Sequence, residues 1–155
     1  MRGRTTRSSG PILVPALRAA TAVGRSTRPL AGPANMLIWN KADFIECLET
    51  TPTFDDTYDP YYLFTVTKHG LRLEITLYED AGDVYISLFQ ENSTSAFLKF
   101  TLLQCSGARF VRTHGKEYLE FAPARLFEQR YDGESLIPAG IRITVNPNIL
   151  VENYV

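Results

Sequence analysis

The feature that most constrains this chain is a regular alternation of apolar and polar residues between Tyr61 and Phe121. The clearest segment is 71–78, in which every second residue is leucine or isoleucine. Because successive side chains of a strand point to opposite faces of a sheet, a period of two predicts strands with one buried face. Short polar turns, several with glycine, separate these segments, so the pattern predicts an antiparallel meander.

The alternation and its turns predict about six or seven strands, and Gly107 ends the fourth of them. Residues 149–154 form either a further edge strand or a tail. The segments expected to be strands are 61–66, 71–78, 84–89, 96–104, 108–113, 116–121 and 141–145.

One helix is expected before the strands, from Lys41 to about Thr50. Asn40 is a suitable N-cap, and Pro52 prevents much continuation. An apolar stripe at helical spacing is formed by Phe44, Ile45 and Leu48. We therefore expect one α+β domain over residues 36–155: an N-terminal amphipathic helix packed on a curved, mainly antiparallel sheet, with closure towards a barrel as an open alternative.

Residues 1–35 differ from the rest of the chain, since they contain six arginines, no acidic residue and no aromatic residue. This composition predicts disorder. Three interpretations stay open: a mitochondrial presequence, a secretory signal, or an upstream extension preceding a translation start at Met36. The secretory interpretation is the weakest, because Arg18 interrupts the apolar run.

Charge is distributed unevenly along the domain. Residues 36–155 contain ten Lys and Arg and all seventeen acidic residues, a net charge of -7. An acidic surface argues against direct nucleic-acid binding and suits a protein partner with a basic surface. Most of the excess lies between Lys41 and Pro60. The residues we expect to bind a partner are the six acids of this stretch and two tyrosines of the meander: Asp43, Glu46, Glu49, Asp55, Asp56, Asp59, Tyr78 and Tyr85.

The face of the meander opposite its aliphatic residues is unusually aromatic. Either the predicted helix or a curled sheet covers part of this face, or it is a recognition surface, since tyrosine and arginine are enriched at interface hot spots. The residues expected there are Tyr61, Tyr78, Tyr85, Phe89, Phe97 and Tyr118, with Arg72, Lys99 and Arg109.

No catalytic, metal or cofactor site is predicted. His69 and His114 each precede a glycine in an expected hairpin turn, where a positive φ is needed, so we interpret both as turn residues. Cys47 and Cys105 show no metal-ligand spacing and are expected to be reduced and partly buried. The acidic turn of Glu79, Asp80 and Asp83 could gather a divalent cation, but charged turns are common without metal.

These observations favour a small acidic protein-binding module, of the kind that inhibitors and immunity proteins represent, over an enzyme. Two alternatives stay open. One is a small-molecule-binding or hydrolytic domain with a pocket in the curved sheet and polar groups such as Arg109, Glu120 or His114. The other is a subunit of a homo-oligomer. No apolar run reaches the length of about 18 residues that spans a bilayer, and the expected location is the cytoplasm, or the mitochondrion if residues 1–35 are a presequence.

Overall fold

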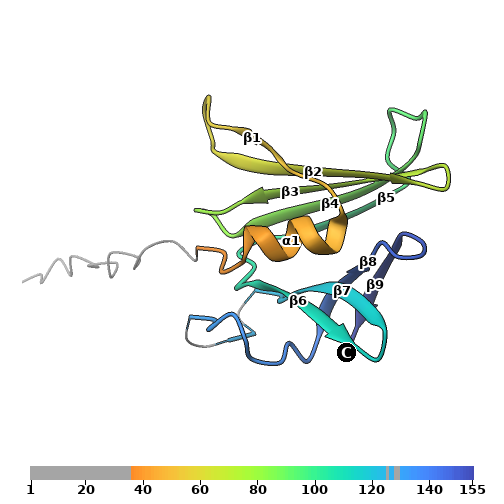
Figure 1. The fold of residues 1–155 in the computed structure, drawn as a ribbon. Coiled ribbons are helices and arrows are strands. Elements are labelled where there is room, and N and C mark those ends of the chain that lie inside the picture. The colour runs from red at the N-terminus through yellow and green to blue at the C-terminus, as the bar shows by residue number, and fades with distance from the viewer. Residues whose placement is uncertain (1–35, 125, 128–129) are drawn as a thin grey trace, which may run out of the picture. The chain divides into compact units, whose positions relative to one another are not determined.

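The computed structural model describes residues 36–124, 126–127 and 130–155. Within these ranges the chain forms one helix and nine strands, arranged in two antiparallel sheets (Figure 1). The broad α+β class is confirmed. The expected single sheet of six or seven strands is wrong, and the described strands form two separate sheets and close no barrel. The leader proposed for residues 1–35 lies outside the described residues.

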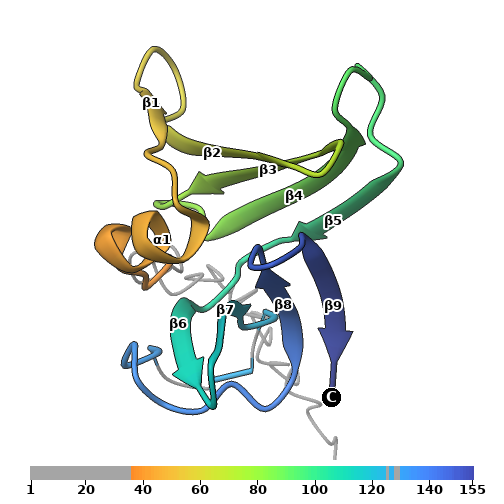
Figure 2. The same cartoon turned by 45° about the vertical axis from the view of Figure 1, so that its right-hand side comes forward.

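The first sheet has five strands that pair in chain order (Figure 2). Its central strands follow the predicted period of two, because Leu73, Ile75 and Leu77 are buried while the residues between them are partly exposed. Residues 53–55, which are not among the expected strands, form a short edge strand. The strands are β1 (Thr53–Asp55), β2 (Tyr61–Lys68), β3 (Leu71–Tyr78), β4 (Asp83–Gln90) and β5 (Leu98–Leu102).

The second sheet has four strands, which also pair in chain order. Its last strand shows that the segment near the C-terminus is an edge strand and not a tail. The strands are β6 (Ala108–Thr113), β7 (Lys116–Phe121), β8 (Gly140–Thr144) and β9 (Leu150–Tyr154).

The chain leaves the first sheet between Leu102 and Ala108, where Gln104 adopts a left-handed backbone conformation with φ 54°. Gly107 lies in a crowded position, since a Cβ atom there would come within 2.2 Å of the Tyr131 ring and 2.9 Å of the Ile38 carbonyl oxygen. Only glycine fits at that approach. The glycine that the sequence marks as a strand end therefore separates two sheets instead of two strands of one sheet.

Both tight turns that contain histidine have the predicted conformation. His69 and Gly70 have φ values of 51° and 75°, and His114 and Gly115 have values of 49° and 74°. Positive φ at two successive positions matches the twist of a two-residue hairpin turn. The structural interpretation of these histidines is confirmed.

The helix α1 spans Lys41–Leu48, two residues fewer than expected. The Asn40 side chain accepts a hydrogen bond from the Ala42 amide at 2.9 Å, which confirms the predicted N-cap, and Glu49 ends the helix with φ 55°. As the one helix of the described residues, with eight residues, it is too short to cross a membrane.

The helix packs into the interior of the domain through Phe44. This ring lies 5.5 Å from the Phe64 ring of β2 and 5.7 Å from the Phe121 ring of β7, so it contacts both sheets. Its neighbours Cys47 and Leu48 are also buried. The helix therefore covers the inner, aliphatic side of the first sheet, and the alternative in which it covers the aromatic side is wrong.

Candidate functional site

The outer face of the first sheet carries a row of three tyrosines across neighbouring strands. Tyr61 of β2 lies 5.5 Å from Tyr78 of β3, and Tyr78 lies 5.8 Å from Tyr85 of β4, measured between ring centroids. Tyr85 is 38% exposed. The row forms because antiparallel pairing places outward-facing residues of successive strands side by side. Two members predicted for this face, Arg109 and Tyr118, instead belong to the second sheet.

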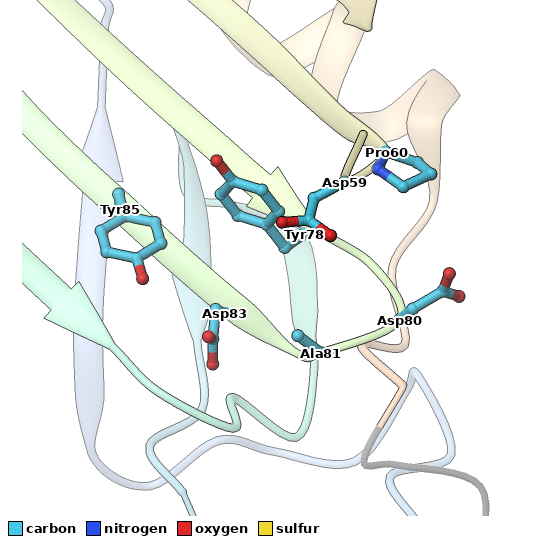
Figure 3. Close-up of a pocket in the computed structure, with 7 residues that line it drawn as sticks. All are labelled: Asp59, Pro60, Tyr78, Asp80, Ala81, Asp83 and Tyr85. Carbon is cyan, nitrogen blue, oxygen red and sulfur yellow. The ribbon is translucent and has the colours of Figure 1, made fainter. Parts of the chain in front are cut away.

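A partly open pocket of about 400 Å³ is lined by two members of this row, Tyr78 and Tyr85. It is formed where β2 begins, β3 ends and β4 begins. Figure 3 shows the Asp59 carboxylate beside the Tyr78 ring, with Tyr85 and Asp83 on the other side and Asp80 at the rim. The lining residues are Asp59, Pro60, Tyr78, Asp80, Ala81, Asp83 and Tyr85.

The pocket concentrates negative charge. Asp59, Asp80 and Asp83 form no ion pair with any other residue in the described ranges, although Asp83 accepts a hydrogen bond from the Gln104 amide at 2.9 Å. Burial raises the pKa of Tyr78, and the nearby Tyr61 side chain and the charge of Asp59 raise it further. Tyr78, which is neutral at physiological pH even with its ordinary pKa, stays a hydrogen-bond donor over a wider pH range, beside acceptors that attract cations.

Two of the predicted acids, Glu46 and Glu49, are in a different situation, because cations of the same chain pair with them. Glu46 lies 2.6 Å from the Arg112 guanidinium of β6. Glu49 accepts a hydrogen bond from Asn146 at 2.7 Å and pairs with Lys68 at 3.3 Å, and these contacts lower the pKa of Glu49. These two carboxylates connect α1 to strands and loops of the domain.

The remaining predicted acids also differ from one another. Asp55 accepts hydrogen bonds from the Thr57 amide at 2.9 Å and the Tyr61 hydroxyl at 3.5 Å, and the Thr57 contact lowers the pKa of Asp55. Asp56 is exposed and Asp43 is half-buried. Neither lines the pocket.

Of the eight residues expected to bind a partner, the structure brings three together at the pocket: Asp59, Tyr78 and Tyr85. Sequence reasoning missed Asp80 and Asp83 as partners of these residues. The sequence did show that the turn of Glu79, Asp80 and Asp83 is acidic and could attract a cation. It did not show that this turn lies next to the loop that ends at Pro60.

A second cluster of charged and aromatic side chains lies on the second sheet. Glu120 is almost fully buried and pairs with Arg109 at 3.0 Å and Arg142 at 2.8 Å. The Arg142 guanidinium carbon lies 4.3 Å from the Tyr118 ring centroid and 4.2 Å from that of Tyr154. Arg109 and Glu120, which the pocket alternative named, are thus saturated by contacts within the chain, and His114 lies apart at an exposed hairpin turn.

Two further candidates from the sequence are the acidic turn and the cysteines. Within the described residues no group of three or more His, Cys, Asp or Glu side chains is placed to hold a metal ion. Cys47 and Cys105 are both free and buried, as predicted, and burial raises the pKa of each thiol to about 12.

Comparisons with known proteins yield one informative likeness. No family model matches the chain, and no curated protein does. A solved structure does: a chain of a contact-dependent growth inhibition toxin and immunity protein complex from Klebsiella pneumoniae 342. It superimposes with a TM-score of 0.58 at 13% identity, over 76% of this chain and 95% of that one. At this identity the likeness shows the fold alone.

Proposed function

We propose that this chain is a protein-binding module that covers a basic surface of a protein partner with the outer face of its first sheet. The observation that carries the proposal is the position of the unpaired acids. Asp59, Asp80 and Asp83 line a pocket together with Tyr78 and Tyr85, and their carboxylates form no ion pair with another described residue. The helix acids Glu46 and Glu49, by contrast, are already neutralised inside the chain.

We further propose that the module is of the immunity type, binding a toxin and masking its basic surface. The similar solved structure contains a toxin and an immunity protein. The acidic domain suits the inhibitor side of such a pair, because an inhibitor must complement a basic protein surface. The two free buried thiols agree with a reducing compartment such as the cytoplasm.

The arrangement can bind a protein in two ways at once. The tyrosine rings offer large, rigid contact area at a low entropic cost, and their hydroxyl groups can hydrogen-bond at the interface. The carboxylates attract a basic partner over a distance of about one Debye length, which accelerates association at low salt. We therefore expect an association rate that falls steeply as salt is added.

The test begins with capture of the partner. The full chain is immobilised, incubated with an extract of its native host at low salt, and eluted with a salt gradient, and the bound protein is identified by mass spectrometry. The affinity of the purified partner is then measured for the wild type and for a double variant, Asp59→Asn with Asp80→Asn. We expect the double variant to bind at least about tenfold more weakly.

Glu46→Gln is the matched control, since it removes one carboxylate that lies outside the pocket and is paired with Arg112. It should bind the partner like the wild type. Equal affinity of the wild type and the double variant would contradict the proposed surface. Growth arrest on expression of this chain alone, relieved by the captured partner, would instead assign it to the toxin side of such a pair.

One observation supports a second candidate. The pocket volume of about 400 Å³ is within the range of small-molecule sites, so a small organic cation is the alternative occupant. A metabolite extract that raises the melting temperature of the wild type, but not of the double variant, would favour this candidate over a protein partner.

A further inference from the structure

The second sheet shows how this chain holds an arginine. The Arg142 guanidinium lies between the rings of Tyr118 and Tyr154 and donates a hydrogen bond to Glu120 at 2.8 Å. The three neighbours come from β7 and β9, the strands that flank β8. Aromatic faces and a carboxylate from adjacent strands therefore hold one guanidinium within the chain, although its Nε atom has no hydrogen-bond partner among the described residues.

The pocket of the first sheet contains the same chemical groups. Tyr78 and Tyr85 contribute rings from adjacent strands, and Asp59 and Asp83 contribute carboxylates. The difference is the cation, because these carboxylates pair with no Lys or Arg among the described residues. Since the two rings lie edge to face, with 81° between their planes, a guanidinium would stack on one ring while the other closes the side of the pocket.

We propose that the pocket takes an arginine side chain of the protein partner in preference to a lysine side chain. The inference rests on the proposed function and identifies which partner residue the site recognises. A guanidinium is planar, stacks on an aromatic ring and is more weakly hydrated than an ammonium group. It also presents several N–H donors in one plane, which can reach Asp59 and Asp83 on different sides of the pocket.

The pocket dimensions agree with this occupant. A volume of about 400 Å³ exceeds what one guanidinium needs, so the aliphatic stem of the arginine can enter as well. Tyr78 is protonated at neutral pH, since the ordinary tyrosine pKa of 10.0 is raised further here, so the site presents a neutral ring to a guanidinium. The exposed edge of Tyr85 leaves the entrance accessible.

The experiment compares two capped tripeptides, Gly-Arg-Gly and Gly-Lys-Gly, in separate NMR titrations of the full chain labelled with ¹⁵N. We expect the arginine peptide to shift the amide signals of residues 78–85 saturably, and to bind about two- to fivefold more tightly than the lysine peptide. Asp59→Asn and Tyr85→Leu should each lower the affinity for the arginine peptide. Each should also bring that affinity closer to the affinity for the lysine peptide.

Matched controls are available in the same loop. Asp56→Asn removes an exposed aspartate, and Tyr58→Leu removes a tyrosine that is 93% exposed, and neither residue lines the pocket. Both should bind the arginine peptide like the wild type, and far-UV circular dichroism checks that every variant is folded.

Two failures can be told apart. Equal affinity for the two peptides, or shifts outside residues 78–85, would overturn the arginine inference while leaving a basic protein partner in place. A captured partner whose affinity is insensitive to Asp59→Asn would overturn the proposed binding surface itself.

Discussion

The two sheets of this domain carry similar charged and aromatic groups on the faces opposite the aliphatic core, but these groups are largely buried and paired on one sheet and exposed on the other. On the second sheet, Glu120 is enclosed by Arg109 and Arg142, and tyrosine rings cover Arg142. On the first sheet, the tyrosine row ends in a pocket whose carboxylates have no cationic partner among the described residues. The Glu120 cluster pairs its charges within the chain, whereas the carboxylates of the first sheet's pocket are left for solvent or a partner.

This difference separates stability from binding. A buried ion pair is costly to break, because removal of one partner leaves a charge without compensation in a poorly solvated site. An exposed carboxylate without an internal partner contributes little to folding, so it is free to serve binding. Substitutions in the two clusters should therefore affect different measurements.

The largest effect is expected for Glu120→Ala. It leaves the guanidinium groups of Arg109 and Arg142 without their shared acceptor in a largely buried position, so the free energy of unfolding should fall by about 3–5 kcal/mol. Urea denaturation followed by circular dichroism measures the loss. A decrease of less than about 1 kcal/mol would show that the cluster is better solvated than its geometry indicates.

The pocket supplies the opposing control for this experiment. Asp59→Asn should change the free energy of unfolding by no more than about 0.5 kcal/mol, because Asp59 is exposed and has no ion pair within the described residues. If Asp59→Asn destabilised the chain as strongly as Glu120→Ala, the pocket carboxylates would also be needed for stability, and the proposed difference between the two clusters would be wrong.

Local sequence signals predicted the elements of the fold well. The period of two located the central strands, Asn40 marked the helix start, and the two His-Gly pairs marked hairpin turns. Each of these features depends on residues close together in the chain. The division into two sheets was missed because it depends on the close approach of Gly107 to Tyr131 and Ile38, which are distant in sequence.

The candidate site was predicted only in part for the same reason. The sequence showed where acids concentrate, but it could not show which of them are paired. Glu46 meets Arg112 across 66 positions of the chain, and Glu49 meets Asn146 across 97. Asp59 joins Tyr78 and Tyr85 at the pocket because adjacent strands begin and end there. A count of charges therefore includes carboxylates that are already paired within the chain.

A moderate, pH-dependent effect is expected for Asp132→Ala in the loop whose residues Tyr131 and Ile137 pack together. The Asp132 carboxylate accepts hydrogen bonds from the Ser135 hydroxyl and from the Ser135 and Glu134 amides, which lower the pKa of Asp132 to about 2. Because this pKa is below the ordinary value of 3.8, the stabilisation is fully present above about pH 4 and is lost as the pH falls towards 2.

Thermal melts of the wild type and Asp132→Ala across pH 2–7 measure this effect. The difference between their melting temperatures should be largest above about pH 5 and should narrow below pH 4. Asp56→Ala is the matched control, because it removes an exposed aspartate from the loop between β1 and β2. This variant should have the same melting temperature as the wild type at every pH. A difference between wild type and Asp132→Ala that is constant with pH would show that the carboxylate charge plays no part.

The smallest effect is expected for Glu46→Gln. This variant tests whether an exposed but paired acid contributes to stability, as the Glu120 cluster does, or to binding, as the pocket acids do. Glu46 and Arg112 are both more than half exposed, so solvent and salt screen their attraction. The variant should show a slight decrease in melting temperature at low salt that disappears in about 1 M salt, where the Debye length is only about 3 Å.

Its affinity for the partner should match that of the wild type, because the carboxylate already has a cation inside the chain. A loss of partner affinity without a change in melting temperature would move Glu46 into the binding surface and extend that surface from the pocket to the helix.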